Sequence, residues 1–101
     1  MATATRVPSR AATGPNGLLA HRIPFRSHGS FHAVSGAINE TGRLPLEWRH
    51  RYRADQDIIA YTVYSYSTPI AWVTETGHVE IPDVGYSLTT TRHQNNCRAW
   101  L

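Results

Sequence analysis

The sequence contains no lysine, so all ten of its basic residues are arginines. A GC-rich genome is the simplest explanation, because arginine codons are rich in G and C and lysine codons are not. Selection for guanidinium groups that grip phosphate with two hydrogen bonds is the second explanation. The bias therefore points to a type of genome before it points to a ligand.

Cysteine is nearly absent, and the single Cys97 excludes a disulfide within the chain. A lone cysteine makes a reducing compartment the default, so we expect a cytoplasmic protein. No apolar run approaches the roughly 20 residues of a membrane-spanning helix, so we expect no membrane partner. The 101 residues allow one domain, which at this size is marginally stable and would gain from a partner.

Acidic residues are missing from the first 39 positions, which carry the four arginines Arg6, Arg10, Arg22 and Arg26. From Glu40 onward there are six arginines and seven acidic residues, so that part has a net charge of −1. A basic N-terminal segment on a nearly neutral body is typical of proteins that contact nucleic acid or another anionic surface.

We interpret residues 1–20 as a flexible basic arm and residues 21–101 as a single small β-rich domain. Prolines and glycines interrupt the arm at several positions. Either a partner orders such an arm or the domain captures it. A transit peptide has a similar composition, but the sequence GPNG and the lack of a sustained amphipathic period favour an arm.

The segments that follow read mainly as strands. Residues 21–36 hold one or two short strands, and IIAYTVYSY (58–66) predicts a central strand because it is β-branched and aromatic throughout. Pro69 predicts a bend or bulge before the strand IAWVT, and ETGH (75–78) predicts a hairpin turn. YSLTT (86–90) predicts a last short strand. We therefore expect an α+β fold, a small bent antiparallel sheet or partly open barrel of about five strands with one short C-terminal helix.

The cleanest periodicity lies in residues 46–53, LEWRHRYR, where apolar or aromatic residues alternate with charged ones. A period of two predicts a strand with one buried face. Arg49, Arg51 and Arg53 would then project at intervals of about 6.6 Å, twice the rise per residue. Such a row could bind the phosphates of an extended single strand, with stacking on Tyr61, Tyr64 and Tyr66 of a paired strand. In the alternative, the arginines face acidic residues or water and the tyrosines fill the core.

The C-terminal helix is expected to begin at Thr91, because Thr91 and Gln94 have the T-x-x-Q spacing of a capping box. Cys97, Trp100 and Leu101 would form its apolar stripe.

Arg92 and His93 are not explained by this cap. Arginine is unfavourable at a helix start unless a negative charge is near. We expect an internal salt bridge to Glu75, Glu80 or Asp83 in preference to a ligand phosphate.

Metal and enzyme sites are weakly indicated. His93 and Cys97 are four residues apart, as are His28 and His32, but this is no recognised zinc pattern, so we expect no metal and no cofactor. His93 could act as a general base near a hydroxyl group. Because no nucleophile elbow, phosphate loop or spaced carboxylate pair is present, a small nuclease or hydrolase using His93 and Arg92 is only the alternative hypothesis.

Two blocks of sequence carry a resemblance, YTVYSYSTPIAW (61–72) and YSLTTTRHQ (86–94). They resemble a family of small uncharacterised proteins from actinobacteria and their bacteriophages, with the pattern Y-x-V-Y-S-Y-x-T-P-I-A-W followed by Y-S-x-T-T-x-R-H-Q. Ser67 stands where glycine is frequent. The resemblance implies a phage or high-GC bacterial origin and no established activity. Small phage proteins of this kind often bind and redirect a host component, which is an analogy.

Our leading hypothesis is a non-enzymatic binding protein that engages a host macromolecule, protein or nucleic acid with nearly equal weight. The expected contact residues are Arg6, Arg10, Arg22, Arg26, Trp48, Arg49, Arg51, Arg53, Arg92 and His93. A protein interface would use an aromatic anchor such as Trp48 or Trp72. A free sheet edge would also allow a homodimer.

Overall fold

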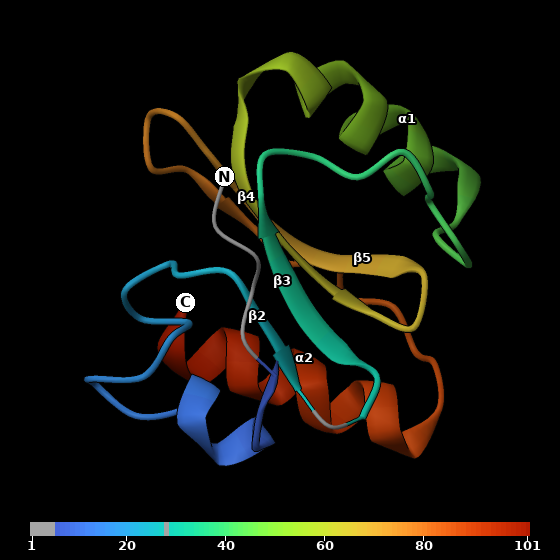
Figure 1. The fold of residues 1–101 in the computed structure, drawn as a ribbon. Coiled ribbons are helices and arrows are strands. Elements are labelled where there is room, and N and C mark those ends of the chain that lie inside the picture. Colours follow the sequence, from blue (N-terminus) through green and yellow to red (C-terminus); the bar gives the residue numbers. More distant parts are fainter. Residues whose placement is uncertain (1–5, 28) are drawn as a thin grey trace.

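The computed structural model describes residues 6–27 and 29–101, which form one sheet with a helix on each face (Figure 1). Strands β2 to β6 form a five-stranded antiparallel sheet in chain order, and β1 joins it in parallel to β2. The strands are β1 (Arg6–Val7), β2 (Phe25–Ser27), β3 (Phe31–Ser35), β4 (Ile59–Ser65), β5 (Thr68–Thr74) and β6 (Val79–Glu80). The helical elements are η1 (Ser9–Ala12), α1 (Leu46–Asp55), η2 (Gln56–Ile58) and α2 (Leu88–Trp100). The predicted α+β class is confirmed, with one α-helix more than expected.

The central hairpin of β4 and β5 follows the β-branched and aromatic sequence that predicted it. The strands pair from Ile59 opposite Thr74 to Ser65 opposite Thr68, and Tyr66 and Ser67 form the turn. Pro69 lies in β5 opposite Tyr64, beside an irregularity in the register. A bulge of this kind tolerates a residue that cannot donate a backbone hydrogen bond, so the expectation for Pro69 is confirmed.

The expected strand at residues 46–53 is wrong, because this segment is the helix α1. Its burial follows a spacing of four, with Tyr52 buried and Trp48 half-buried, whereas Leu46 is 63% exposed. Residues four apart share one helix face, and this sequence satisfies that period as well as a period of two. Leucine, glutamate, arginine and alanine also favour helices. Arg49 and Arg53 therefore share one helix face and Arg51 points away from it, so the three side chains do not form one row.

Helix α2 begins earlier than predicted, which corrects both the expected last strand at residues 86–90 and the capping box. Ser87 is the N-cap, and its hydroxyl accepts a hydrogen bond from the Thr90 backbone N–H at 3.2 Å. The Gln94 side chain instead donates to the Val84 carbonyl at 2.9 Å. A run of hydroxyl residues offers several possible caps. The cap at Ser87 is selected because it lets the helix bury one face against the sheet. The buried residues of this face are Thr90, His93, Gln94 and Cys97.

Each helix covers a separate hydrophobic core. The core on the α1 side contains Leu44, Tyr52, Ile59 and Trp72. The core on the α2 side is larger and is built mainly from β2 to β5, with Phe25, Phe31, Val63, Ile70 and Cys97 among its members. Alternate residues of the central strands β4 and β5 thus face opposite helices, except at the two irregularities of their register.

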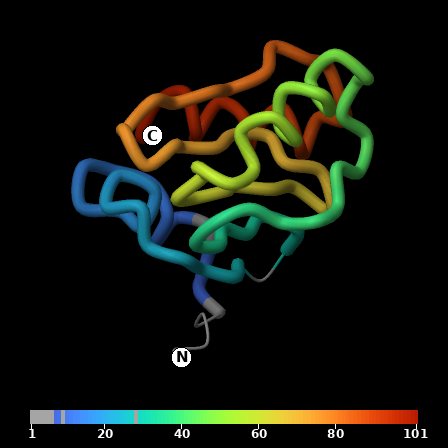
Figure 2. The backbone as a smooth tube through the Cα atoms, turned by 90° about the horizontal axis from the view of Figure 1, so that it is seen from above, coloured from blue at the N-terminus to red at the C-terminus, as the bar shows by residue number. Residues whose placement is uncertain are grey.

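Part of the segment expected as an arm lies in the larger core. Ala12 and Leu19 are fully buried there, and the backbone N–H of Leu19 bonds the Ala12 carbonyl at 3.1 Å. Figure 2 shows these N-terminal turns beside the body of the molecule, and Figure 1 places them near the end of α2. Residues 1–5 of the expected arm lie outside the described residues.

The outer strands of the sheet, β1 and β6, have two residues each. A homodimer through either edge would therefore gain few backbone hydrogen bonds. In the described part of the chain, neither α1 nor α2 combines the length and apolar character needed to cross a membrane.

Candidate functional site

The arginines of α1 hold the helix to the rest of the chain. Arg49 donates from Nη2 to the Leu44 carbonyl at 3.2 Å, and Arg53 donates from Nη2 to the Asn39 carbonyl at 2.8 Å. Both acceptors belong to the loop that leads into α1. These guanidinium groups therefore stabilise the loop, although both side chains remain exposed.

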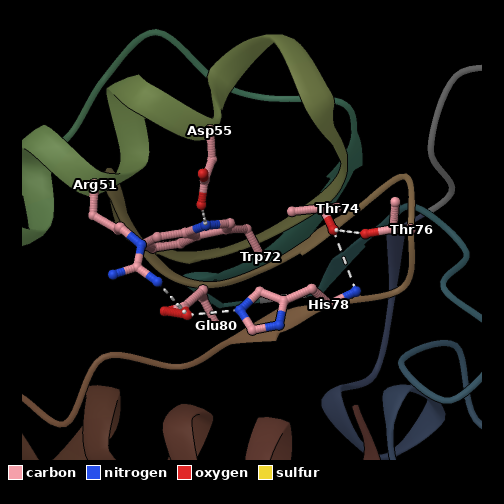
Figure 3. Close-up of polar contacts among 7 residues, drawn as sticks. All are labelled: Arg51, Asp55, Trp72, Thr74, Thr76, His78 and Glu80. Atoms are coloured by element: carbon pink, nitrogen blue, oxygen red, sulfur yellow. Dashed lines mark hydrogen bonds and ion pairs between the residues drawn. The ribbon is translucent and has the colours of Figure 1, made fainter.

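Arg51 takes part in a small charge cluster at the β6 edge (Figure 3). Its Nη2 lies 3.2 Å from Glu80 Oε1, and Nε2 of His78 lies 2.8 Å from the same oxygen. Nearby, the Trp72 indole donates to Asp55 Oδ2 at 3.2 Å and ties the end of α1 to β5. Arg51 thus links α1 to β6, a surface contact that contributes about 0–1 kcal/mol.

The two tryptophans named as interface anchors have different surroundings. Trp72 is fully buried, so it cannot reach a partner and that expectation is wrong. Trp48 is half-buried and meets Trp72 edge to face, with ring centroids 6.3 Å apart. A surface hollow of about 460 Å³ lies beside Trp48, with Glu47, His50 and Arg51 around it.

Arg92 and His93 do not form a joint site. Arg92 is exposed, and the expected salt bridge to Glu75, Glu80 or Asp83 is wrong, because Arg92 makes no ion pair among the described residues. Glu80 pairs with Arg51 and His78. Asp83 lies 3.5 Å from Arg98 instead. The His93 side chain is instead buried against the sheet, where it contacts Ser65 and Phe31.

His93 belongs to a buried polar cluster between α2 and β4. Its ring stacks on Phe31 with centroids 4.4 Å apart, and its Nδ1 lies 2.8 Å from Ser65 Oγ. Ser65 Oγ is also 3.0 Å from Thr90 Oγ1. Burial lowers the pKa of His93, and His32 nearby lowers it further, so the imidazole is neutral at neutral pH.

This burial predicts that acid destabilises the protein through His93. An unfolded histidine has a pKa of about 6.5, and the folded pKa is lower. Between these two values the unfolded chain binds more protons, so the free energy of unfolding falls as the pH falls through this window and levels off below it. Urea unfolding from neutral to mildly acidic pH measures the effect. His93→Gln should flatten the dependence; equal slopes for both proteins would contradict it.

The basic residues of the N-terminal strands form a more open surface. Arg26 is exposed between two buried neighbours in β2, and the backbone register places it opposite Arg6 on one side and His32 on the other. His32 in turn lies opposite Tyr64, with ring centroids 5.3 Å apart. We call Arg26, His32 and Tyr64 the basic row; of Arg6 only the backbone is described. Neighbouring strands lie about 4.8 Å apart, so the row crosses three strands of one sheet face.

The basic row lies on the same face of the sheet as α1 and runs from β4, which α1 contacts, outward to β2. Tyr64 shares this face with Thr62, whose hydroxyl contacts the Tyr52 hydroxyl of α1 at 3.4 Å. Arg10 and Arg22 are exposed as well, in η1 and in the loop before β2. In the sequence, Tyr64 and Arg26 are 38 positions apart and stand out only as separate candidates. That His32 lies between them follows only from the register of β2, β3 and β4.

Metal ligands are not brought together in the described part of the chain. No group of three or more histidine, cysteine, aspartate or glutamate side chains there could hold an ion. His28 lies outside the described residues. Cys97 is fully buried, and burial raises the pKa of its thiol to about 12, so it stays protonated.

Comparison with known proteins gives a family and no activity. A family model described as a family of unknown function, DUF8033, matches residues 27–99. No curated protein and no solved structure matches the chain. The match runs from the end of β2 almost to the end of α2 and includes α1, so it is wider than the two blocks that carried the resemblance. The chain therefore belongs to DUF8033, a family of unknown function.

Proposed function

We propose that the protein is a non-enzymatic binding protein that engages single-stranded nucleic acid through the basic row and the N-terminal arginines. The observation that carries this proposal is the alignment of Arg26, His32 and Tyr64 on neighbouring strands. Arg26 is exposed and Tyr64 is half-buried, and an accessible aromatic ring next to a cation provides stacking for a base and a charge for a phosphate. Arg10 and Arg22 are also exposed, but they belong to the N-terminal segment that packs into the core on the α2 side, so they would contact the nucleic acid beyond the basic row.

The arginines of α1 are a less suitable surface for nucleic acid than the basic row. Arg49, Arg51 and Arg53 each have partners within the chain. A phosphate would have to compete with those partners. The all-arginine composition and the resemblance suggest a phage or actinobacterial source, in which the target would be a host nucleic acid in the bacterial cytoplasm.

Fluorescence anisotropy with a labelled oligothymidine and a matched oligouridine tests the proposal. The dissociation constant should rise steeply with salt, because each phosphate contact releases counterions. Tyr64→Ala should raise the dissociation constant about 5- to 150-fold, the range expected for one lost stacking contact. Arg26→Gln should weaken binding. It should also reduce the slope of the logarithm of the affinity against the logarithm of the salt concentration by about one.

The matched control is Arg98→Gln, an exposed arginine of α2 that lies near Asp83. It removes the same charge from another face, so it should leave the affinity nearly unchanged. A flat salt response, or equal losses in the Arg26 and Arg98 variants, would exclude the basic row. A protein that remains bound after nuclease treatment of a host lysate would then favour a protein partner.

A further inference from the structure

A pocket of about 380 Å³ opens where three parts of the chain meet. They are the loop before α1, the turn between β4 and β5, and the start of α2; Figure 1 shows the β4–β5 turn and the start of α2 at the same end of the molecule. We call it the turn pocket; residues 42–43, 65–68, 86–87 and 90 line it. Its volume lies in the range of about 300–1,000 Å³ typical of small-molecule sites. Arg43 is the one charged residue in this lining, so the pocket suits an anion.

Arg43 is held at the pocket by its backbone while its side chain is left available. Its backbone N–H donates to Thr68 Oγ1 at 2.8 Å. The preceding Gly42 has a φ of +50°, and a Cβ there would collide with Ser67 and Thr68. The loop therefore packs closely against the turn. Within the described residues the exposed Arg43 guanidinium group makes no hydrogen bond or ion pair.

Tyr86 supplies a hydrogen-bond donor that has no acceptor in the described structure. Its hydroxyl oxygen is buried and unpartnered. A buried polar atom without a partner is costly, and such atoms are rare in native proteins. Burial raises the pKa of Tyr86, with Arg43 acting in the opposite direction, so the hydroxyl keeps its proton. Because Tyr86 lines the turn pocket, a ligand oxygen that reaches its hydroxyl from there would supply the missing partner.

Tyr66 brings an aromatic ring to the same pocket under backbone strain. Its φ is +57°, a conformation that bulky residues rarely adopt, and its side chain is 60% exposed. Glycine would occupy this turn position without strain. Strained residues of this kind concentrate at ligand sites, where the surrounding structure holds them.

We propose that the turn pocket binds the phosphate monoester of a nucleotide. Arg43 and the Tyr86 hydroxyl would bind the phosphate, and the Tyr66 ring would stack on the base. The N-terminus of α2, capped by Ser87, adds its positive dipole end to the same site. The phosphate could belong to a free mononucleotide or to the 5′ end of a strand. This site is separate from the basic row and does not depend on the nucleic-acid proposal.

Isothermal titration calorimetry with adenosine 5′-monophosphate, adenosine and inorganic phosphate tests the chemistry. The monophosphate should bind more tightly than either of its parts, because only it uses both the cation and the ring. Arg43→Gln should weaken its binding about 10- to 150-fold, the range for a lost charge-assisted hydrogen bond. Arg98→Gln, which removes an exposed arginine from the last turn of α2, is the matched control and should bind like the parent protein.

Tyr66→Gly separates a loss of binding from a loss of stability, because this variant should be at least as stable as the parent protein. Glycine relieves the positive φ, so the thermal midpoint should rise while the affinity for the monophosphate falls. If the midpoint rises and the affinity does not change, the ring has no role and the nucleotide assignment is overturned.

A 5′-phosphorylated oligothymidine and its 5′-hydroxyl counterpart separate the two sources. A preference for the phosphorylated strand that disappears in Arg43→Gln assigns the pocket to strand ends. Binding of the monophosphate without such a preference assigns it to free nucleotides. If neither the monophosphate nor the phosphorylated end depends on Arg43, the turn-pocket proposal fails. Salt-dependent binding that requires Arg26 would still support the basic row in that case.

Discussion

Leu19→Ala should lower the free energy of unfolding by about 2–5 kcal/mol. Leu19 is fully buried in the larger core, together with Ala12, Phe25 and Phe31. Removing its side chain loses the transfer free energy of the buried carbons and leaves a cavity that the sheet and α2 fill only in part. Urea unfolding followed by circular dichroism measures the loss.

This substitution also decides the role of the N-terminal segment. A flexible arm that ends at residue 20 predicts no change in stability, whereas a segment that belongs to the core predicts the full cost. Leu88→Ala is the matched control, because Leu88 is 69% exposed at the start of α2. It should change stability by less than about 0.5 kcal/mol. Similar values for Leu19 and Leu88 would show that the segment is not part of the folded core in solution.

Trp72→Ala should cost about 3–5 kcal/mol, the largest effect that we expect from a single substitution. Trp72 is the centre of the smaller core, where Tyr52 meets it edge to face with ring centroids 5.0 Å apart. Its indole N–H also anchors Asp55 at the end of α1. A domain of this size has a total stability of about 5–15 kcal/mol, so the variant should be close to unfolding at moderate temperature.

Two further tryptophan variants separate the contributions of Trp72. Trp72→Phe keeps an aromatic ring but loses the hydrogen bond to Asp55, so it should cost much less than the alanine variant. Trp100→Ala is the exposed control, because this residue is 36% exposed at the end of α2. Thermal unfolding ranks the three variants. A Trp100 variant as unstable as Trp72→Ala would contradict the assignment of Trp72 to the core.

Local sequence patterns predicted the structure correctly where they are compatible with only one type of secondary structure. Residues 58–66 are β-branched and aromatic, which suits a strand buried on both faces and few other structures. The ETGH turn and the bulge at Pro69 follow from the backbone limits of glycine and proline. These features were sufficient to predict an antiparallel α+β fold.

The segment at residues 46–53 shows where a pattern fails. Its side chains alternate like a strand, and its aromatic residues Trp48 and Tyr52 are also spaced like one face of a helix. The choice depends on Tyr52, whose hydroxyl donates to the Ile38 carbonyl at 3.1 Å and accepts from the Ile38 N–H at 2.7 Å. Those partners are distant in sequence and adjacent only after folding. A site built on the strand interpretation, the row Arg49, Arg51 and Arg53, was lost with it.

The sequence by itself determined the composition of the chain, the concentration of positive charge before residue 40, the β-rich core and the presence of a C-terminal helix. These properties depend on residue identity or on neighbours a few positions away. Tertiary structure alone decided which arginines are engaged, that Trp72 is buried, and that Arg43, Tyr66 and Tyr86 line one pocket. The physical reason is that a side chain's partners come from segments far away in the chain. Their free energy of interaction exists only when the sheet register and the packing of both helices are in place.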